Sequence, residues 1–99
     1  PEHSLEITVK GQVNPLTGMV MNITDLKEAI QKAIMDPLDH RNLDTDVEFF
    51  QDRPSTTENL AIYIWTNIQT YLPPNLLHRV RIDETDQNRV EYYGPQVTG

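Results

Sequence analysis

Asp39 and His40 are neighbours in a segment that is too irregular to be a strand. A carboxylate beside an imidazole can hold the ring in one tautomer and raise its basicity, which leaves the other ring nitrogen free for proton transfer. The alternative is a loop in which Asp39 bonds to the backbone and His40 faces solvent. The pair by itself therefore indicates either proton-transfer chemistry or a polar turn.

Glu84 is a second carboxylate, and its direction can be predicted from its strand. Residues 77–85 alternate between two faces, and Val80 and Ile82 mark the face of Glu84 as the core side. A carboxylate on an apolar face costs free energy unless a partner binds it. Glu84 is therefore a candidate ligand-binding residue, unless the strand ends early enough to return the side chain to water.

Ser55-Thr-Thr-Glu58 matches a capping box, a pattern that starts a helix. Backbone N–H groups are free at such a start, so Thr56, Thr57 and Glu58 could contact a ligand there. The capping box already explains Ser55 and Glu58, so a purely structural role for this segment stays open.

Alternation predicts three strands that position these residues. Ser4 to Val13 is expected to be a half-buried strand, closed by turn residues at Asn14 to Gly18. Leu77 to Thr85 and Arg89 to Tyr93 are expected to pair as a hairpin across the turn at residues 86–88.

Two helices are predicted between the first strand and the hairpin. Asn22 is the expected N-cap of the first, and Pro37 is expected to end it by pushing Asp36 out of helical geometry. Asp39 and His40 would then lie on the loop that leaves this helix. The second is expected to run from the capping box to the prolines at 73 and 74. The apolar stripes are Leu26, Ala29, Ile30, Ala33 and Ile34 in the first helix, and Ala61, Ile64, Trp65, Ile68 and Leu72 in the second.

The predicted order is strand, helix, helix, strand, strand, which indicates an α+β fold with both helices on one face of an antiparallel sheet. The first and last strands would leave exposed edges that favour pairing with another chain. Residues 1–99 are expected to form one domain with a modest core, which is either marginally stable alone or leans on subunit contacts.

Charge and composition exclude several classes of function. The net charge is −7, which makes nucleic acid an unfavourable partner because phosphate binding needs clustered cations. Arg41, Arg79 and Arg81 are candidates for a local anion site, and the alternative for each is a solvated surface charge. The chain has no cysteine, which excludes disulfides, cysteine metal ligands and a cysteine nucleophile within it. It has no apolar run that could span a membrane and no leader, so we expect a cytoplasmic protein without membrane contact.

Short motifs between Ile7 and Tyr93 together resemble the 6-pyruvoyl-tetrahydropterin synthase family. They occur in the family's order and spacing, which is more specific than any one of them. The motifs are Gly18-Met-Val-Met-Asn22, Asp25-Leu-Lys27, Pro37-Leu-Asp-His40, Asn42-Leu-Asp44, Ser55-Thr-Thr-Glu-Asn59, Tyr63-Ile-Trp65 and Glu84-Thr-Asp86.

The resemblance implies a tunnelling fold, in which a four-stranded antiparallel sheet carries two helices between its second and third strands. It also implies hexamers of two stacked trimers with active sites at subunit interfaces. The family reaction removes triphosphate from 7,8-dihydroneopterin triphosphate and rearranges the side chain by internal redox, in tetrahydrobiopterin biosynthesis.

The resemblance assigns roles to five residues. Asp39 and His40 match the aspartate and histidine that relay protons with a catalytic cysteine. Glu84 matches the glutamate that anchors the pterin ring, and Thr56 and Thr57 match threonines beside that pocket.

The chain departs from the family at its start. The family holds zinc with three histidines and places a cysteine shortly before two of them, whereas all four are missing here. His3 and His78 do not replace them, because a catalytic zinc site needs three protein ligands. We therefore expect an N-terminally incomplete tunnelling-fold domain that binds no zinc, binds pterin poorly and turns over little by itself.

Two other functions remain possible. The chain could be a non-catalytic module that pairs with full-length subunits through its open sheet edge. It could also be a 6-carboxy-tetrahydropterin synthase relative from deazapurine synthesis, although residues 37–44 and 63–65 favour the biopterin enzyme.

Overall fold

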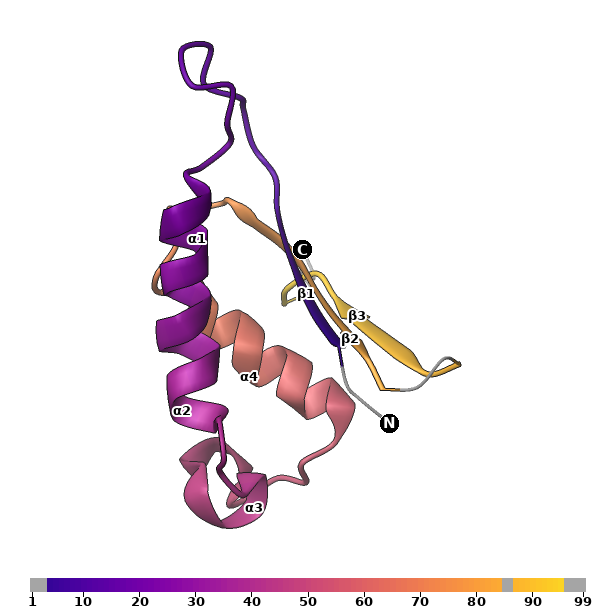
Figure 1. The fold of residues 1–99 in the computed structure, drawn as a ribbon. Coiled ribbons are helices and arrows are strands. Elements are labelled where there is room, and N and C mark those ends of the chain that lie inside the picture. Colours follow the sequence, from indigo (N-terminus) through magenta and orange to yellow (C-terminus); the bar gives the residue numbers. More distant parts are fainter. Residues whose placement is uncertain (1–3, 85–86, 96–99) are drawn as a thin grey trace.

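An antiparallel sheet carries helices on one of its faces (Figure 1). The computed structural model describes residues 4–84 and 87–95. The strands of this part are β1 (Ser4–Val9), β2 (Leu77–Asp83) and β3 (Arg89–Tyr92), in the order β1-β2-β3 with both pairs antiparallel. The predicted α+β class, the hairpin and the two edge strands are confirmed.

The helical segments form a long rod, a connecting segment and a second long helix. The rod consists of α1 (Ile23–Ile30), the π-helical η1 (Gln31–Met35) and α2 (Asp36–Leu38). The connection contains α3 (Leu43–Asp46) and the 3₁₀ turn η2 (Glu48–Phe50), neither of which the sequence pattern predicted. The second long helix is α4 (Thr57–Gln69), which lies between the rod and the sheet (Figure 1). None of these helices is long and apolar enough to cross a membrane.

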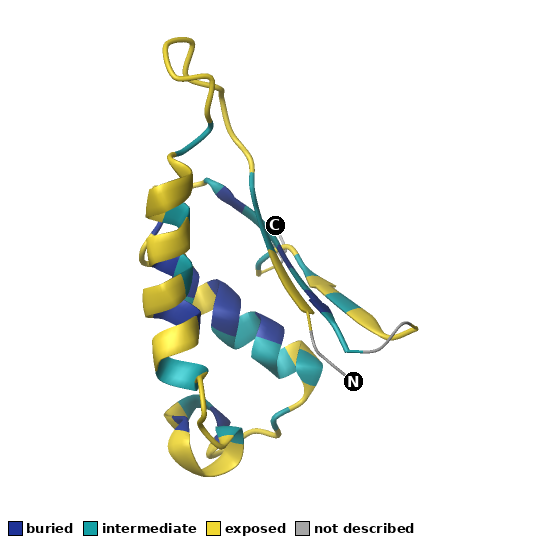
Figure 2. Ribbon diagram, viewed as in Figure 1, coloured by how far each residue is buried: buried dark blue, intermediate teal, exposed yellow. Residues whose placement is uncertain are grey.

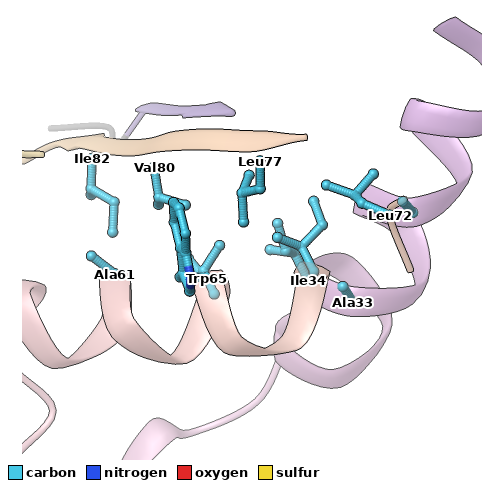
Figure 3. Packing of buried hydrophobic residues seen from close by; sticks show 11 residues of the cluster. Ala33, Ile34, Ala61, Trp65, Leu72, Leu77, Val80 and Ile82 are labelled. Carbon is cyan, nitrogen blue, oxygen red and sulfur yellow. The ribbon is translucent and has the colours of Figure 1, made fainter. Parts of the chain in front are cut away.

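The core lies between α4 and the sheet (Figures 2 and 3). Ile68 of α4 and Val80 of β2 are each 0% exposed. Full burial of one such aliphatic side chain stabilises the fold by about 1.5–3 kcal/mol. Most of the remaining cluster follows the predicted helical stripes and the predicted core face of β2, and Leu77 joins it against the predicted alternation. These residues are Ala29, Ala33, Ile34, Ala61, Ile64, Trp65, Leu72, Leu77 and Ile82.

The prediction that Pro37 ends the first helix is wrong. Asp36 is helical (φ −61°, ψ −47°), and its N–H donates to Gln31 O across a π turn. A proline has no N–H for the carbonyl four residues earlier. Here that carbonyl belongs to Ala33, and it accepts a hydrogen bond of 3.3 Å from Nδ2 of Asn67 on α4. The helix therefore continues through Pro37 because a side chain from another element supplies the missing donor.

The predicted capping box is displaced by one residue. Thr56, not Ser55, is the N-cap of α4, and its hydroxyl oxygen accepts a bond of 3.2 Å from Asn59 N. Nδ2 of Asn59 in turn donates to Pro54 O at 2.9 Å. The third helical residue therefore fixes the helix start through its amide side chain, and Glu58 does not close the box.

The alternation predicted that His78 and Val80 share one face of the strand, and this prediction is wrong. The pairing of β1 with β2 shifts between Thr8 and Val9, so that Val9 lies opposite Leu77 while Thr8 lies opposite Arg79. This irregularity adds one residue to β2 and gives the core position to Leu77, which is 9% exposed. The His78 ring instead lies 5.4 Å from the ring of Tyr93.

The first strand ends earlier than predicted, and a projecting arm follows it (Figure 1). The turn at Asn14–Gly18 is confirmed, because Gly18 N donates to Asn14 O at 2.8 Å and Gly18 has a φ of +72°. Leu16 at this turn is 95% exposed. The expectations for His3, Thr85 and Asp86 lie outside the described residues.

Candidate functional site

Glu84 and Thr57 are brought together from opposite parts of the chain. Glu84 directly follows β2, and Thr57 is the first residue of α4. The Thr57 hydroxyl donates a hydrogen bond of 3.0 Å to Oε1 of Glu84, and both residues are partly buried. The Glu84 side chain therefore reaches the helix-covered face, as its predicted parity requires.

The backbone around Glu84 is held by the hairpin. Glu84 N donates to Asn88 O at 2.9 Å, which extends the β2–β3 pairing by one step beyond the end of β2. The carboxylate is thus fixed from two sides, by the hairpin through its backbone and by α4 through its side chain. An anchored carboxylate at a strand end can accept hydrogen bonds from a planar ligand with adjacent N–H groups.

Thr56 has a structural role in this site. Its hydroxyl oxygen is occupied as the N-cap acceptor of α4, and the residue is exposed. Thr57 is therefore the threonine of this pair that contacts Glu84. The contribution of Thr56 is to fix the helix start from which the Thr57 hydroxyl reaches the carboxylate.

Asp39 and His40 occupy a tight turn between α2 and α3. Asp39 is extended (φ −64°, ψ 130°), His40 has a left-handed φ of +57°, and Arg41 N donates to Leu38 O at 3.1 Å. Such a turn favours glycine or asparagine at the position of His40. His40 occupies this position with a positive φ, where a smaller residue would suit the backbone better.

The side chains of the Asp39–His40 pair face solvent. Nε2 of His40 lies 3.6 Å from Oδ2 of Asp39, and the two side chains are 92% and 56% exposed, respectively. This distance is longer than a hydrogen bond, so the carboxylate does not fix the imidazole tautomer in this conformation. A second surface that covers the turn could shorten the contact by removing water from the pair.

The structure places the Asp39–His40 turn and the Thr57–Glu84 contact at different positions. The turn follows α2 at one end of the helical rod, whereas Thr57 and Glu84 lie where α4 approaches the end of β2 (Figure 1). The five predicted site residues therefore form two groups within one chain.

Arg79 and Arg81 are engaged on the sheet face opposite the core. Both approach Glu6 of β1, at 3.4 Å and 3.5 Å, and Arg79 also lies 3.9 Å from Glu91 of β3. These charges therefore connect the three strands, and neither arginine is held ready for an anion in this conformation. Arg41 is an exposed residue of the α2–α3 connection.

Asp83 is the acidic centre of the same network. Arg81 Nε donates to Asp83 Oδ1 at 3.2 Å, and this bond is the main cause that lowers the pKa of Asp83 below its usual 3.8. Partial burial opposes that shift, while hydrogen bonds from Arg89 at 3.0 Å and from Ser4 at 3.2 Å add to it. The same bond raises the pKa of Arg81.

The family's metal does not fit the described residues. Across residues 4–84 and 87–95, no three His, Cys, Asp or Glu side chains are grouped so that they could hold a metal ion. The two histidines of this part, His40 and His78, belong to separate elements.

Asn67 is the structural contributor that sequence reasoning missed. Its amide lies on the helix α4 and bonds to the π turn that leads to Asp39 and His40. One clue was present in the sequence: a proline inside an otherwise helical apolar pattern needs a donor from elsewhere. The sequence does not say which side chain supplies that donor.

Comparison with solved structures defines the class of fold. The chain superposes on a 6-pyruvoyl tetrahydropterin synthase of Caenorhabditis elegans with a TM-score of 0.88 and 38% sequence identity, covering 94% of this chain and 66% of that one. The three-stranded sheet with its helices therefore has the tunnelling fold.

Sequence comparisons define the family. The family model described as 6-pyruvoyl tetrahydropterin synthase matches residues 2–95, and the chain belongs to this family. It is 56% identical over 92 residues to the 6-pyruvoyl tetrahydrobiopterin synthase of Poecilia reticulata, covering 93% of this chain and 63% of the relative. Proteins of the same name in Drosophila melanogaster and Homo sapiens are 57% identical over 94 residues and 53% identical over 92 residues.

The chain spans about three-fifths of the length of these curated relatives. The match to the Drosophila melanogaster protein covers 94% of this chain and 56% of that protein. The match to the Homo sapiens protein covers 93% of this chain and 63% of that protein. The matched part shows the family of the chain, but it leaves more than a third of each relative's length unmatched.

Proposed function

We propose that this chain supplies the proton-transfer and pterin-binding groups of a 6-pyruvoyl-tetrahydropterin synthase. In this reaction, triphosphate is eliminated from 7,8-dihydroneopterin triphosphate and the remaining side chain is rearranged by internal redox. The observation that carries the proposal is the hydrogen bond between Thr57 and Glu84, which anchors a carboxylate at the predicted pterin position. The names of the similar proteins support the biopterin enzyme over the deazapurine relative.

Glu84 and Thr57 would bind the substrate ring. A carboxylate can accept two parallel hydrogen bonds from the adjacent N–H groups of a pterin, which fixes the orientation of the ring. Because Thr57 donates to Oε1, the carboxylate is held in one direction before the substrate arrives. Binding then costs less side-chain entropy than it would with a free glutamate.

His40 would accept and return protons during the elimination and the internal redox. Asp39 would orient the imidazole once the turn is covered. The high exposure of His40 supports a site shared between copies, because a solvent-facing histidine can reach the substrate bound by another subunit. We therefore propose a homo-oligomer, with hexamers as in the family, in which one copy offers Asp39 and His40 and another offers Thr57 and Glu84.

The 99-residue chain alone is proposed to turn over slowly. The family chemistry that the resemblance implies uses a cysteine and three histidine ligands for zinc, and the sequence has no cysteine and three histidines in all. The described residues do not provide a three-ligand set.

The test is release of inorganic triphosphate from 7,8-dihydroneopterin triphosphate with zinc added. It would compare this chain, any longer product of the same gene and the His40→Ala variant of each. We expect faster release by a longer product that carries the four missing residues, and a loss of about 10²–10⁴-fold in its His40→Ala variant. Equal rates for His40→Ala and its parent would refute the proton-transfer role.

A second function is favoured by one observation. β1 and β3 are both edge strands in the described sheet, and an open edge can pair with another chain. If no product of the gene releases triphosphate, the chain would be a non-catalytic assembly module that joins full-length subunits through such an edge.

A further inference from the structure

We propose that Asn67 is a positioning residue for the Asp39–His40 pair. The proposal rests on the function proposed above, because it assigns a support to the proton-transfer turn. Asn67 is a residue of α4, and it contacts neither member of the pair through any hydrogen bond described above. Its action is exerted through the π turn that precedes them.

Pro37 leaves the carbonyl of Ala33 without its usual helical donor. In a regular helix, the N–H of residue 37 would bond to the carbonyl of Ala33, but proline has no N–H. Ala33 is 1% exposed, and a carbonyl in such a place needs a partner. Nδ2 of Asn67 supplies it at 3.3 Å.

The helical turn before Pro37 is wider than that of a regular α-helix. The bond from Asp36 N to Gln31 O spans five residues and widens the helix at this point. One extra residue in a helical turn rotates everything downstream by about 100° relative to a regular α-helix. The direction in which Asp39 and His40 leave α2 is therefore set by this wide turn, and single π turns of this kind occur frequently at functional sites.

The helix α4 carries both attachments. Thr57 at the start of α4 bonds to Glu84, and Asn67 bonds to Ala33. Asp39 N in turn donates to Met35 O at 2.8 Å, which connects the pair to the π turn. Both groups of the proposed site are therefore attached to α4, the Glu84 group at the start of this helix and the Asp39–His40 group near its end.

Loss of the Asn67 amide should leave the fold intact. A hollow of about 450 Å³ borders Asn67, Ala33 and Pro37, so water can reach the Ala33 carbonyl when the amide is removed. Asn67→Ala should therefore fold with only a small fall in Tm. Water satisfies the carbonyl but is an exchangeable donor that does not fix the direction of the turn, so the pair would lose its fixed position.

Pro37→Ala provides a rescue that a merely structural role would not predict. An alanine at position 37 has an N–H that can donate to the Ala33 carbonyl, four residues earlier. The wide turn between Gln31 and Asp36 does not depend on that donor. The double variant Asn67→Ala, Pro37→Ala should therefore restore the position of the pair without the amide. Thr66→Ala is the matched control, because it removes a neighbouring hydroxyl that donates to Ile62 O within the same helix.

The experiment combines kinetics with NMR of the His40 imidazole. In the zinc-supplemented protein, Asn67→Ala should lower kcat for triphosphate release about tenfold or more and leave KM within about twofold. The imidazole resonances of His40 should shift or broaden in Asn67→Ala, remain unchanged in Thr66→Ala and return in the double variant.

Failure of this inference can be told apart from failure of the proposed function. An active parent whose kcat and His40 resonances are unchanged by Asn67→Ala would overturn the positioning role alone. Absence of turnover in this chain and in every longer product of the gene would overturn the proposed function, and the NMR comparison would still decide whether Asn67 positions His40. An equal loss of kcat in Asn67→Ala and in the double variant would also overturn the positioning role of Asn67.

Discussion

The hydroxyl of Thr57 donates a hydrogen bond of 3.0 Å to Oε1 of Glu84, across 27 positions of sequence. This bond joins the start of α4 to the end of β2, so it connects the helical layer to the strand that runs through the middle of the described sheet. It also fixes the carboxylate to which we assign pterin binding.

Replacing Thr57 by valine should weaken the fold slightly. The shape of the side chain is kept, but a partly buried carboxylate loses a donor, which costs about 1–3 kcal/mol in the free energy of unfolding. Thr57→Ser keeps the hydroxyl and should retain most of the stability. Urea unfolding of the three proteins measures the effect, and equal midpoints for Thr57→Val and the parent would show that the bond contributes nothing.

Replacing His40 by glycine should separate stability from activity. The φ of +57° favours glycine, so the free energy of unfolding should stay the same or rise by up to about 1 kcal/mol. Triphosphate release should be lost together with the imidazole. A variant that keeps its activity would contradict the role of His40, and one that unfolds more easily would contradict the left-handed backbone.

The stability of the chain should fall at acid pH through Asp83. Its pKa is lowered in the folded state, chiefly by the bond from Arg81, so its stabilising effect is complete above the unfolded pKa. The effect is lost as the pH falls below about 4 and through the folded pKa. Chemical unfolding across this range should show a smaller acid loss for Asp83→Asn than for the parent. An equal loss of stability at acid pH in the two proteins would refute the contribution of Asp83.

Replacing Gly94 by alanine should disrupt packing around Trp65. Gly94 has a φ of +99°, and a Cβ at this position would lie 2.6 Å from Cζ2 of Trp65. Gly18 is the matched control, because its φ is +72° and a Cβ there would meet nothing within 4 Å. Both variants pay for the positive φ, but only Gly94→Ala also overpacks the core, by about 1–3 kcal/mol. Thermal unfolding of both proteins measures the difference, and equal losses would argue against the close approach.

Local patterns were sufficient for the order of the three strands, for two of the core positions of β2 and for the direction of Glu84. Alternation in residues 77–83 placed Val80 and Ile82 in the core, because that face of β2 packs on α4 and the rule depends only on the strand. The shift opposite Thr8 and Val9 could not be predicted, since it depends on how β1 pairs with β2.

The errors at the helix ends have a common physical cause. Pro37 stays helical because Asn67 donates from another helix, and the start of α4 is decided by the bond from Asn59 to Pro54 O. Several neighbouring hydroxyl side chains can cap a helix equally well, so the local sequence does not choose among them. For the candidate site, the parity of β2 predicted the direction of Glu84, and the roles of the five residues stay a prediction. The arrangement of these residues in two groups within one chain depends on tertiary packing, so local patterns could not predict it.

The central claim is that the Glu84 carboxylate binds the pterin ring, and calorimetric titration tests it most directly. The chain, Glu84→Gln and Glu91→Gln would each be titrated with 7,8-dihydroneopterin triphosphate without added metal. Glu91 belongs to β3 and approaches Arg79 of the charged sheet face at 3.9 Å, so it controls for the loss of one carboxylate. We predict that Glu84→Gln binds about tenfold more weakly or worse, because a charge-assisted hydrogen bond is lost, while Glu91→Gln binds like the parent. Equal affinity of Glu84→Gln and the parent, or no binding by the parent, would contradict the claim.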